Sequence, residues 1–265
     1  MYGAILGDII GSPYEFDQGD KSKEFELFDP RVHFTDDSAM TLAIAKAILS
    51  AGPDAGEADM KAAMISCMQD FGNRYAIHEY GARFIGWLRE KDPKPYGSFG
   101  NGSAMRVAAV GWCYDSLERT REVARWSAEV SHNHPEGIKG AESVAAAIFL
   151  LRNGSSMEDV KEFICSEFGY DLSRTLDEIR PGYYHVESCQ QTVPEAITAF
   201  LESTDFEDAI RNAVSLGGDC DTLTCITGSL AEAYYGVPAD MVAECERRLP
   251  EELLTVLKRF EEIRR

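Results

Sequence analysis

The sequence has few basic residues for its length of 265. It contains 26 Lys and Arg against 45 Asp and Glu, so its formal net charge is −19. Such an acidic chain is not expected to bind a nucleic-acid backbone or an anionic membrane by general electrostatic attraction. A phosphate ligand would instead need a local site made of backbone amides, a few basic groups or a metal ion. We therefore expect neither nucleic acid nor a membrane as a partner.

The sequence also lacks the signatures of disulfide frameworks, structural zinc sites and membrane spans. Its seven cysteines are odd in number and form no C-x-x-C pair. No apolar run is long enough to cross a bilayer. The N-terminal segment has no basic residue before Lys21, which is not typical of a signal peptide. Together these absences predict a cytoplasmic protein.

Strand signals are scarce, whereas helical periodicity is present along most of the chain. Apolar residues share one helical face in the segments 40–48, 60–71, 206–214 and 253–260. Further segments are rich in helix-forming residues, namely 103–112, 141–151, 194–202 and 222–235. Residues 183–186 are the one strand candidate, within the irregular segment 173–193. We predict an all-α fold, a single compact domain of orthogonal helices over residues 1–265.

Two short segments place a threonine and two aspartates at the start of an expected helix. They are residues 35–37 (Thr-Asp-Asp) and 219–222 (Asp-Cys-Asp-Thr). Each segment alone is explained by helix capping, which needs only one carboxylate. Two buried like charges without a cation are costly, or force a proton onto one of them. Two clusters of matching composition therefore favour a divalent cation held by carboxylate and hydroxyl oxygens.

Three other segments carry polar residues near expected helix ends. Residues 7–15 (GDIIGSPYE) are predicted to form a tight turn that presents Glu15. Residues 99–106 (FGNGSAMR) form a glycine-rich turn whose free amides could hold phosphate oxygens. Residues 131–137 (SHNHPEG) carry two histidines that could bind a metal ion or a phosphate, although such a pair is more often structural.

Taken in order, these motifs resemble the ADP-ribosylglycohydrolase family. The motifs are GDIIGSPYE, FTDDSAM, GNGSAMR, SHNHPEG and GGDCDT, and the pair FTDDSAM and GGDCDT is the most specific. The resemblance implies a compact all-α fold with a two-metal cleft, and two Mg²⁺ ions, or Mn²⁺, as cofactors. It also implies hydrolysis of the glycosidic bond between ADP-ribose and a modified side chain or small molecule.

The resemblance assigns roles to individual residues. The implied metal ligands are Thr35, Asp36, Asp37, Asp219, Asp221 and Thr222. The implied substrate-binding residues are the phosphate loop and a histidine near the diphosphate, namely Gly100, Asn101, Gly102, Ser103 and His132. In the expected reaction, water attacks the anomeric carbon, and Glu15, Asp36 or Asp37 orients or deprotonates it. An arginine, serine or O-acetyl linkage would present the same ADP-ribose half to these motifs.

Two expectations concern substrate recognition and an alternative function. Tyr184, in the irregular segment 173–193, is a candidate for stacking on adenine or ribose. The alternative to an enzyme is a non-catalytic reader that binds ADP-ribose in the same pocket. The presence of every Thr and Asp in both clusters favours the enzyme. The expected partner is an ADP-ribosylated protein or a small-molecule ADP-ribose conjugate, and no oligomeric state is predicted.

Overall fold

Helices are the regular secondary structure of the described chain. The computed structural model describes residues 1–76 and 79–264, and within these ranges it contains α-helices and one 3-10 helix but no strand. The all-α prediction is therefore confirmed. In chain order the elements are α1 (Tyr2–Gly11), the 3-10 helix η1 (Ser12–Tyr14), α2 (Asp36–Ala51), α3 (Glu57–Gly72), α4 (Ala82–Arg89), α5 (Gly102–Met105), α6 (Ala108–Cys113), α7 (Leu117–Glu129), α8 (Pro135–Arg152), α9 (Met157–Phe168), α10 (Leu176–Ile179), α11 (Cys189–Leu201), α12 (Phe206–Val214), α13 (Cys220–Tyr235), α14 (Ala239–Arg248) and α15 (Glu251–Glu261).

The apolar stripes of the sequence all lie in helices that bury them. The stripe 206–214 coincides with α12, and the other three lie within α2, α3 and α15. The segment 103–112 is divided, because α5 ends at Met105 and α6 begins at Ala108. The strand predicted at 183–186 is wrong: these residues form no strand, and nearby Gly100 and Ser188 form an isolated bridge.

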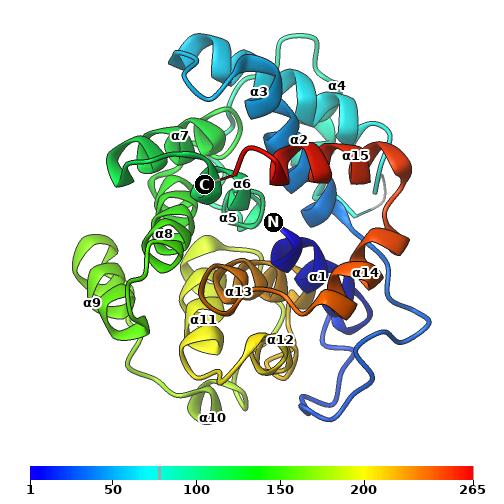
Figure 1. The fold of residues 1–265 in the computed structure, drawn as a ribbon, viewed down its shortest axis with the longest axis vertical. Helices are drawn as coiled ribbons and strands as arrows, with labels where there is room; N and C mark the ends of the chain where they lie inside the picture. Colours follow the sequence, from blue (N-terminus) through cyan, green and yellow to red (C-terminus); the bar gives the residue numbers. More distant parts are fainter. Residues whose placement is uncertain (77–78, 265) are drawn as a thin grey trace.

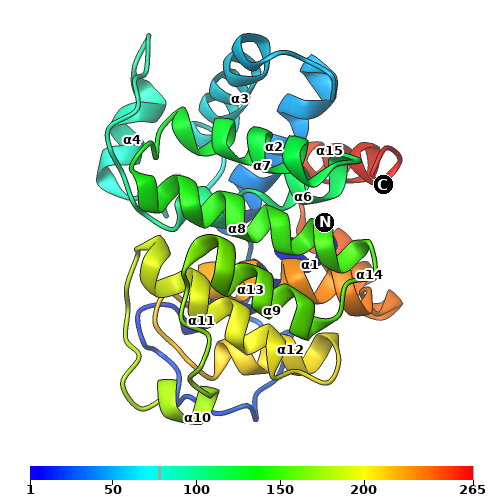
Figure 2. The ribbon, with the colours of Figure 1, turned by 90° about the vertical axis from the view of Figure 1, so that its left-hand side faces the viewer.

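Helix α13 lies at the centre of the fold, and α1 packs along it (Figure 1). All residues of α13 from Cys220 to Glu232 are buried. Helix α8 lies between two groups of helices, with α2, α3, α4 and α7 on one side and α9, α11 and α12 on the other (Figure 2). It contacts α7 and α9 as well as α13, so it joins the two groups into one compact body.

The contact between α1 and α13 is lined by three glycines of α1 spaced four residues apart, Gly3, Gly7 and Gly11. A Cβ atom on Gly7 would lie 2.1 Å from the carbonyl oxygen of Thr224, and one on Gly3 would lie 2.1 Å from that of Gly228. These distances are far below van der Waals contact, so a larger residue would force the two backbones apart.

The tight turn predicted at residues 7–15 is therefore wrong over its first half. Helix α1 continues through Gly7 to Gly11, and the chain turns only in η1, directly before Glu15. The glycines of this segment allow close helix packing, which in a single sequence resembles a turn signal.

The described chain contains no disulfide bond and no candidate membrane-spanning helix. All seven cysteines are free thiols, and six of them are buried. Within residues 1–76 and 79–264, no helix combines the length and the apolar character needed to cross a bilayer. The cytoplasmic location stays a prediction.

A Gly7→Ala variant tests the tightness of the α1–α13 contact. We expect it to lower the free energy of unfolding by roughly 3 kcal/mol, because the new methyl group meets backbone atoms that cannot move aside. Urea denaturation measures this change. The matched control is Gly86→Ala in α4, where a Cβ has open space and alanine should stabilise the helix by up to about 1 kcal/mol. Equal stability of Gly7→Ala and the wild type would contradict the close packing.

Candidate metal centre

Five carboxylates meet at the N-terminal end of α13. They form two groups of three whose ligand atoms all lie within 4.8 Å of one another, Asp8 with Asp37 and Asp221, and Glu15 with Asp219 and Asp221. Asp221 belongs to both groups, so the two groups are adjacent. Oxygen ligands in this number and proximity are what hard divalent cations such as Mg²⁺ require.

Asp8 is the member of this cluster that the sequence analysis missed. It is fully buried in α1, and its carboxylate accepts hydrogen bonds from the amides of Thr35 (2.9 Å) and Ser38 (3.1 Å) and from both of their hydroxyls. These four bonds attach the start of α2 to α1, which makes Asp8 a positioning residue. Its place in the sequence could have identified it, because an aspartate within an apolar helical segment is buried and needs hydrogen-bond partners.

Helix α2 supplies the first predicted Thr-Asp-Asp segment. Thr35 precedes the helix without forming a side-chain cap, and Asp36 and Asp37 occupy its first turn. Asp37 is buried, and its Oδ2 accepts a hydrogen bond from the hydroxyl of Thr222 (3.2 Å). In the described part of the chain its Oδ1 has no hydrogen-bond partner. A buried carboxylate oxygen without a partner is costly, and a bound cation would remove that cost.

Helix α13 supplies the second predicted segment. Asp219 stands at the N-cap position, but its side chain makes no cap bond and its Oδ2 accepts from Asn101 Nδ2 at 2.6 Å. Asp221 Oδ2 accepts from the hydroxyl of Thr35 at 3.2 Å, and Asp221 Oδ1 accepts from the amide of Thr222 at 2.9 Å. Simple capping, the alternative that each segment allowed by itself, therefore does not account for these residues.

Burial and mutual repulsion disfavour the ionised carboxylates. Burial, followed by the charge of Asp221, raises the pKa of Asp8 to about 7 and that of Glu15 to about 8. The same two causes raise the pKa of Asp36 and Asp37 well above the ordinary aspartate value. Without a cation the cluster thus retains protons near neutral pH, and a divalent cation would offset the repulsion.

A cavity of about 470 Å³ opens beside the cluster. It brings together residues that lie far apart in the sequence and that were predicted for metal binding, catalysis or substrate binding. Those that line it are Glu15, Asp36, Asp219, Asp221, Thr222, Gly100, Asn101, Gly102 and His132. The predicted residues Thr35, Asp37 and Ser103 are buried outside this lining.

The glycine-rich loop reaches the cavity, but not all its amides are free as predicted. The amide of Asn101 donates to the carbonyl of Glu187 (2.8 Å), and that of Gly100 donates to the Ser98 hydroxyl (3.1 Å). Within the described residues, the amides of Gly102 and Ser103 have no acceptor. The Ser103 hydroxyl itself points away and donates to a backbone carbonyl of α8 at 2.8 Å, so this side chain holds the loop in place.

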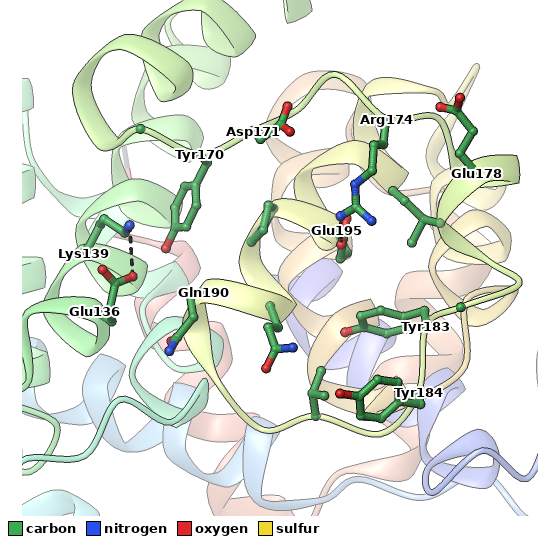
Figure 3. Close-up of a pocket in the computed structure, with 16 residues that line it drawn as sticks. Glu136, Lys139, Tyr170, Asp171, Arg174, Glu178, Tyr183, Tyr184, Gln190 and Glu195 are labelled. Atoms are coloured by element: carbon green, nitrogen blue, oxygen red, sulfur yellow. Dashed lines mark hydrogen bonds and ion pairs between the residues drawn. The ribbon is translucent and has the colours of Figure 1, made fainter.

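The structure does not bring Tyr184 into this cavity. Residues 183–187 form neither helix nor strand, and their side chains divide between two pockets. His185 and Glu187 line the 470 Å³ cavity, whereas Tyr184 and Val186 line a second pocket of about 710 Å³. Figure 3 shows Tyr184 at the edge of that pocket, and its side chain is 60% exposed. A contact between Tyr184 and a ligand in the first cavity has no support in this arrangement.

The raised pKa values predict how the metal-free protein responds to pH. Carboxyls whose pKa is higher in the folded state favour folding at low pH, and this contribution is lost as the pH rises through about 7 and 8 for Asp8 and Glu15. In chelator, the melting temperature should therefore fall as the pH rises from about 5 to about 8 and level off above that, and Mg²⁺ should remove most of the fall. Glu15→Gln should make the fall less steep. Identical pH profiles with and without metal would contradict a cation site here.

Known proteins resemble this chain in both sequence and structure. It matches the family model of ADP-ribosylglycohydrolase over residues 1–264. It is 27% identical to the human ADP-ribosylhydrolase ARH3, over 93% of this chain and 88% of the relative. It is also 27% identical to the ADP-ribosylarginine hydrolase Tri1 of Pseudomonas putida, over 89% of this chain and 70% of the relative. A solved structure described as an ADP-ribosylglycohydrolase-related protein complex shares the fold, with a TM-score of 0.66, 24% identity, and coverage of 98% of this chain and 95% of that one. The chain belongs to the ADP-ribosylglycohydrolase family.

Proposed function

We propose that this protein hydrolyses the glycosidic bond that joins ADP-ribose to a modified group, and that it uses divalent cations held by the carboxylate cluster. The observation that carries the proposal is the 470 Å³ cavity, which joins that cluster to the loop at Gly100–Gly102 and to His132. The relatives' names, ADP-ribosylhydrolase and ADP-ribosylarginine hydrolase, support the same reaction class.

The residues of the cluster suit two Mg²⁺ ions, and Mn²⁺ accepts the same oxygen ligands. The residues that would hold them are Glu15, Thr35, Asp36, Asp37, Asp219, Asp221 and Thr222. When bound, such cations would supply Lewis-acid polarisation of oxygen ligands and would offset the buried negative charge. The unpartnered Oδ1 of Asp37 is the feature that most favours an ion here.

The carboxylates divide into two roles according to their position. Glu15 and Asp36 line the cavity, so they can reach a water molecule beside the substrate. We assign to them the orientation and deprotonation of the attacking water. Asp37 is buried behind them and serves as a ligand. Carboxylates at the cavity wall would also stabilise the positive charge of an oxocarbenium-like transition state.

The cavity lining also carries positive charge, which suits a diphosphate. Arg83 and Arg106 line the cavity together with His132. The amide of Gly102 adds a hydrogen-bond donor beside this group. This local set of donors supplies the anion site that an overall charge of −19 cannot.

The carboxylates Glu79 and Glu187 in the cavity lining favour a substrate in which ADP-ribose is attached to a cationic side chain. Glu79 and Glu187 line the cavity, and their charges contribute to the raised pKa of Glu15. Phe16 is 58% exposed there, with its ring centroid 4.7 Å from that of His185. Carboxylates and an exposed aromatic ring are suitable contacts for a guanidinium group. We therefore propose arginine-linked ADP-ribose as the preferred substrate.

The function is tested by following the release of free ADP-ribose from arginine-modified and serine-modified peptides. We expect metal-dependent release, faster from the arginine-modified peptide and absent in chelator. Asp219→Asn should lower kcat/KM by more than about 100-fold and weaken metal binding with it, because it removes a ligand and not only an outer partner. Asp59→Asn, at an exposed position of α3, is the matched control and should behave as the wild type.

The same assay separates the enzyme from the non-catalytic reader. ADP-ribose binding without release from either peptide would replace the hydrolase by a reader. Neither binding nor release would contradict both functions. Full activity of Asp219→Asn would contradict the metal centre as the site of reaction.

A further inference from the structure

Arg106 is a guanidinium buried without a carboxylate partner. It is 1% exposed, and within the described residues no Asp or Glu pairs with it. Its Nη2 donates to the carbonyl oxygen of Ser127 (2.6 Å) and to Oγ of Ser131 (2.8 Å), while its Nε has no acceptor in that part of the chain. Burial lowers the pKa of Arg106 only to about 10, so the group is charged at neutral pH. An unpaired buried charge destabilises the fold unless a ligand supplies the counter-charge.

Ser131 connects this guanidinium to His132. Its Oγ lies 2.8 Å from Arg106 Nη2 and 2.8 Å from His132 Nδ1. Because a guanidinium only donates hydrogen bonds, Oγ accepts from Arg106 and has its own hydrogen left for Nδ1. Nδ1 is then an acceptor, and the proton of the neutral imidazole is on Nε2.

The Nε2 atom of His132 faces the loop that lines the cavity. A Cβ atom on Gly102 would lie 3.2 Å from Nε2, and one on Gly100 would lie 3.4 Å from it. The ring is nearly buried and packs against Phe84 and Tyr96, with centroid distances of 6.1 and 5.8 Å. This packing fixes the direction in which the ring presents its outer nitrogen.

The charges around His132 keep the ring neutral. Burial, followed by the positive charges of Arg106 and Arg83, lowers the pKa of His132 well below its ordinary value. Tyr96, which also packs on the ring, has a raised pKa because of burial and is uncharged at neutral pH. The protonation of His132 therefore stays the same across the neutral range, and only the choice of tautomer is left to be set.

We propose that Arg106 is a positioning residue that acts through Ser131 to fix His132 as the Nε2–H tautomer. The ring then presents one uncharged N–H donor to the anionic part of the substrate at the Gly100–Gly102 loop. The identity of that anion as a diphosphate rests on the proposed function, whereas the tautomer does not. The arrangement combines a directional hydrogen bond from His132 with the positive charge of Arg106 behind it.

The test is ¹⁵N NMR of the full chain labelled at its five histidines, with a His132→Gln variant to identify the signals. We expect wild-type His132 to show a protonated Nε2 and an unprotonated Nδ1 at every pH from 6 to 8. Ser131→Ala should populate the other tautomer. It should also raise the KM for the ADP-ribosylated peptide roughly tenfold with little change in kcat, the effect of losing one hydrogen bond to a charged group.

The control is Ser229→Ala, which removes another buried serine hydroxyl, one that donates to the carbonyl of Cys225. It should change neither the tautomer nor the KM. An Nδ1–H tautomer in the wild type, or an Nε2–H tautomer that persists unchanged in Ser131→Ala, would overturn the proposal. The wild-type spectrum decides the first point even if a variant fails to fold. If the protein shows the expected tautomer but does not bind ADP-ribose, the role of Arg106 and Ser131 is supported and the proposed function is contradicted.

Discussion

The close crossing of α1 and α13 is the contact on which the rest of the site depends. Because Gly7 allows the backbones to meet, Asp8 is brought from the middle of α1 to the start of α2. There it holds Thr35 and Ser38 through four hydrogen bonds, and Asp37 then faces Thr222 at the start of α13. One buried carboxylate thus sets the relative position of the two helix starts that carry the Thr and Asp residues of the cluster.

Placing carboxylates at the starts of α2 and α13 has a favourable and an unfavourable side. The partial positive charge at a helix N-terminus stabilises a nearby anion by about 0.3–1 kcal/mol. The five carboxylates of the cluster, Asp221 included, need much more than that, in line with the raised pKa values of Asp8 and Glu15. The protein alone therefore supplies too little positive charge to balance these carboxylates, which is the physical reason to expect cations in the cluster.

The cavity lining also contains a buried positive charge that lacks a counter-charge in the described chain. Arg106 is a buried cation without a carboxylate, in a protein with a large acidic excess. It lines the cavity and is hydrogen-bonded to Ser131, whose hydroxyl lies 2.8 Å from Nδ1 of His132. A ligand with a ribose beside the carboxylate cluster and a diphosphate beside Arg106 and His132 would fit both groups of residues. ADP-ribose has this order of chemical groups.

The sequence predicted the positions of the two Thr/Asp segments well because these positions are set locally. Residues 35–37 and 219–222 stand directly before apolar helical stripes, so their place at helix starts follows from the pattern alone. Asp8 was missed because its role depends on a contact between distant helices. Gly7 was assigned to a turn because a glycine used for close packing looks the same in one sequence. Tyr184 was a candidate for stacking on adenine or ribose, but it lines the second pocket and not the first. The irregular segment 173–193 has no periodicity from which the direction of a side chain could be predicted.

Anomalous diffraction from crystals grown with Mn²⁺ would test the assembly of the metal centre most directly. Two anomalous peaks are expected, one beside Asp37 and Asp221 and one beside Glu15, Asp219 and Asp221. Such a result would show that the crossing of α1 and α13 builds a two-metal site. Crystals saturated with Mn²⁺ that show no peak among these carboxylates, or peaks only elsewhere on the surface, would contradict it.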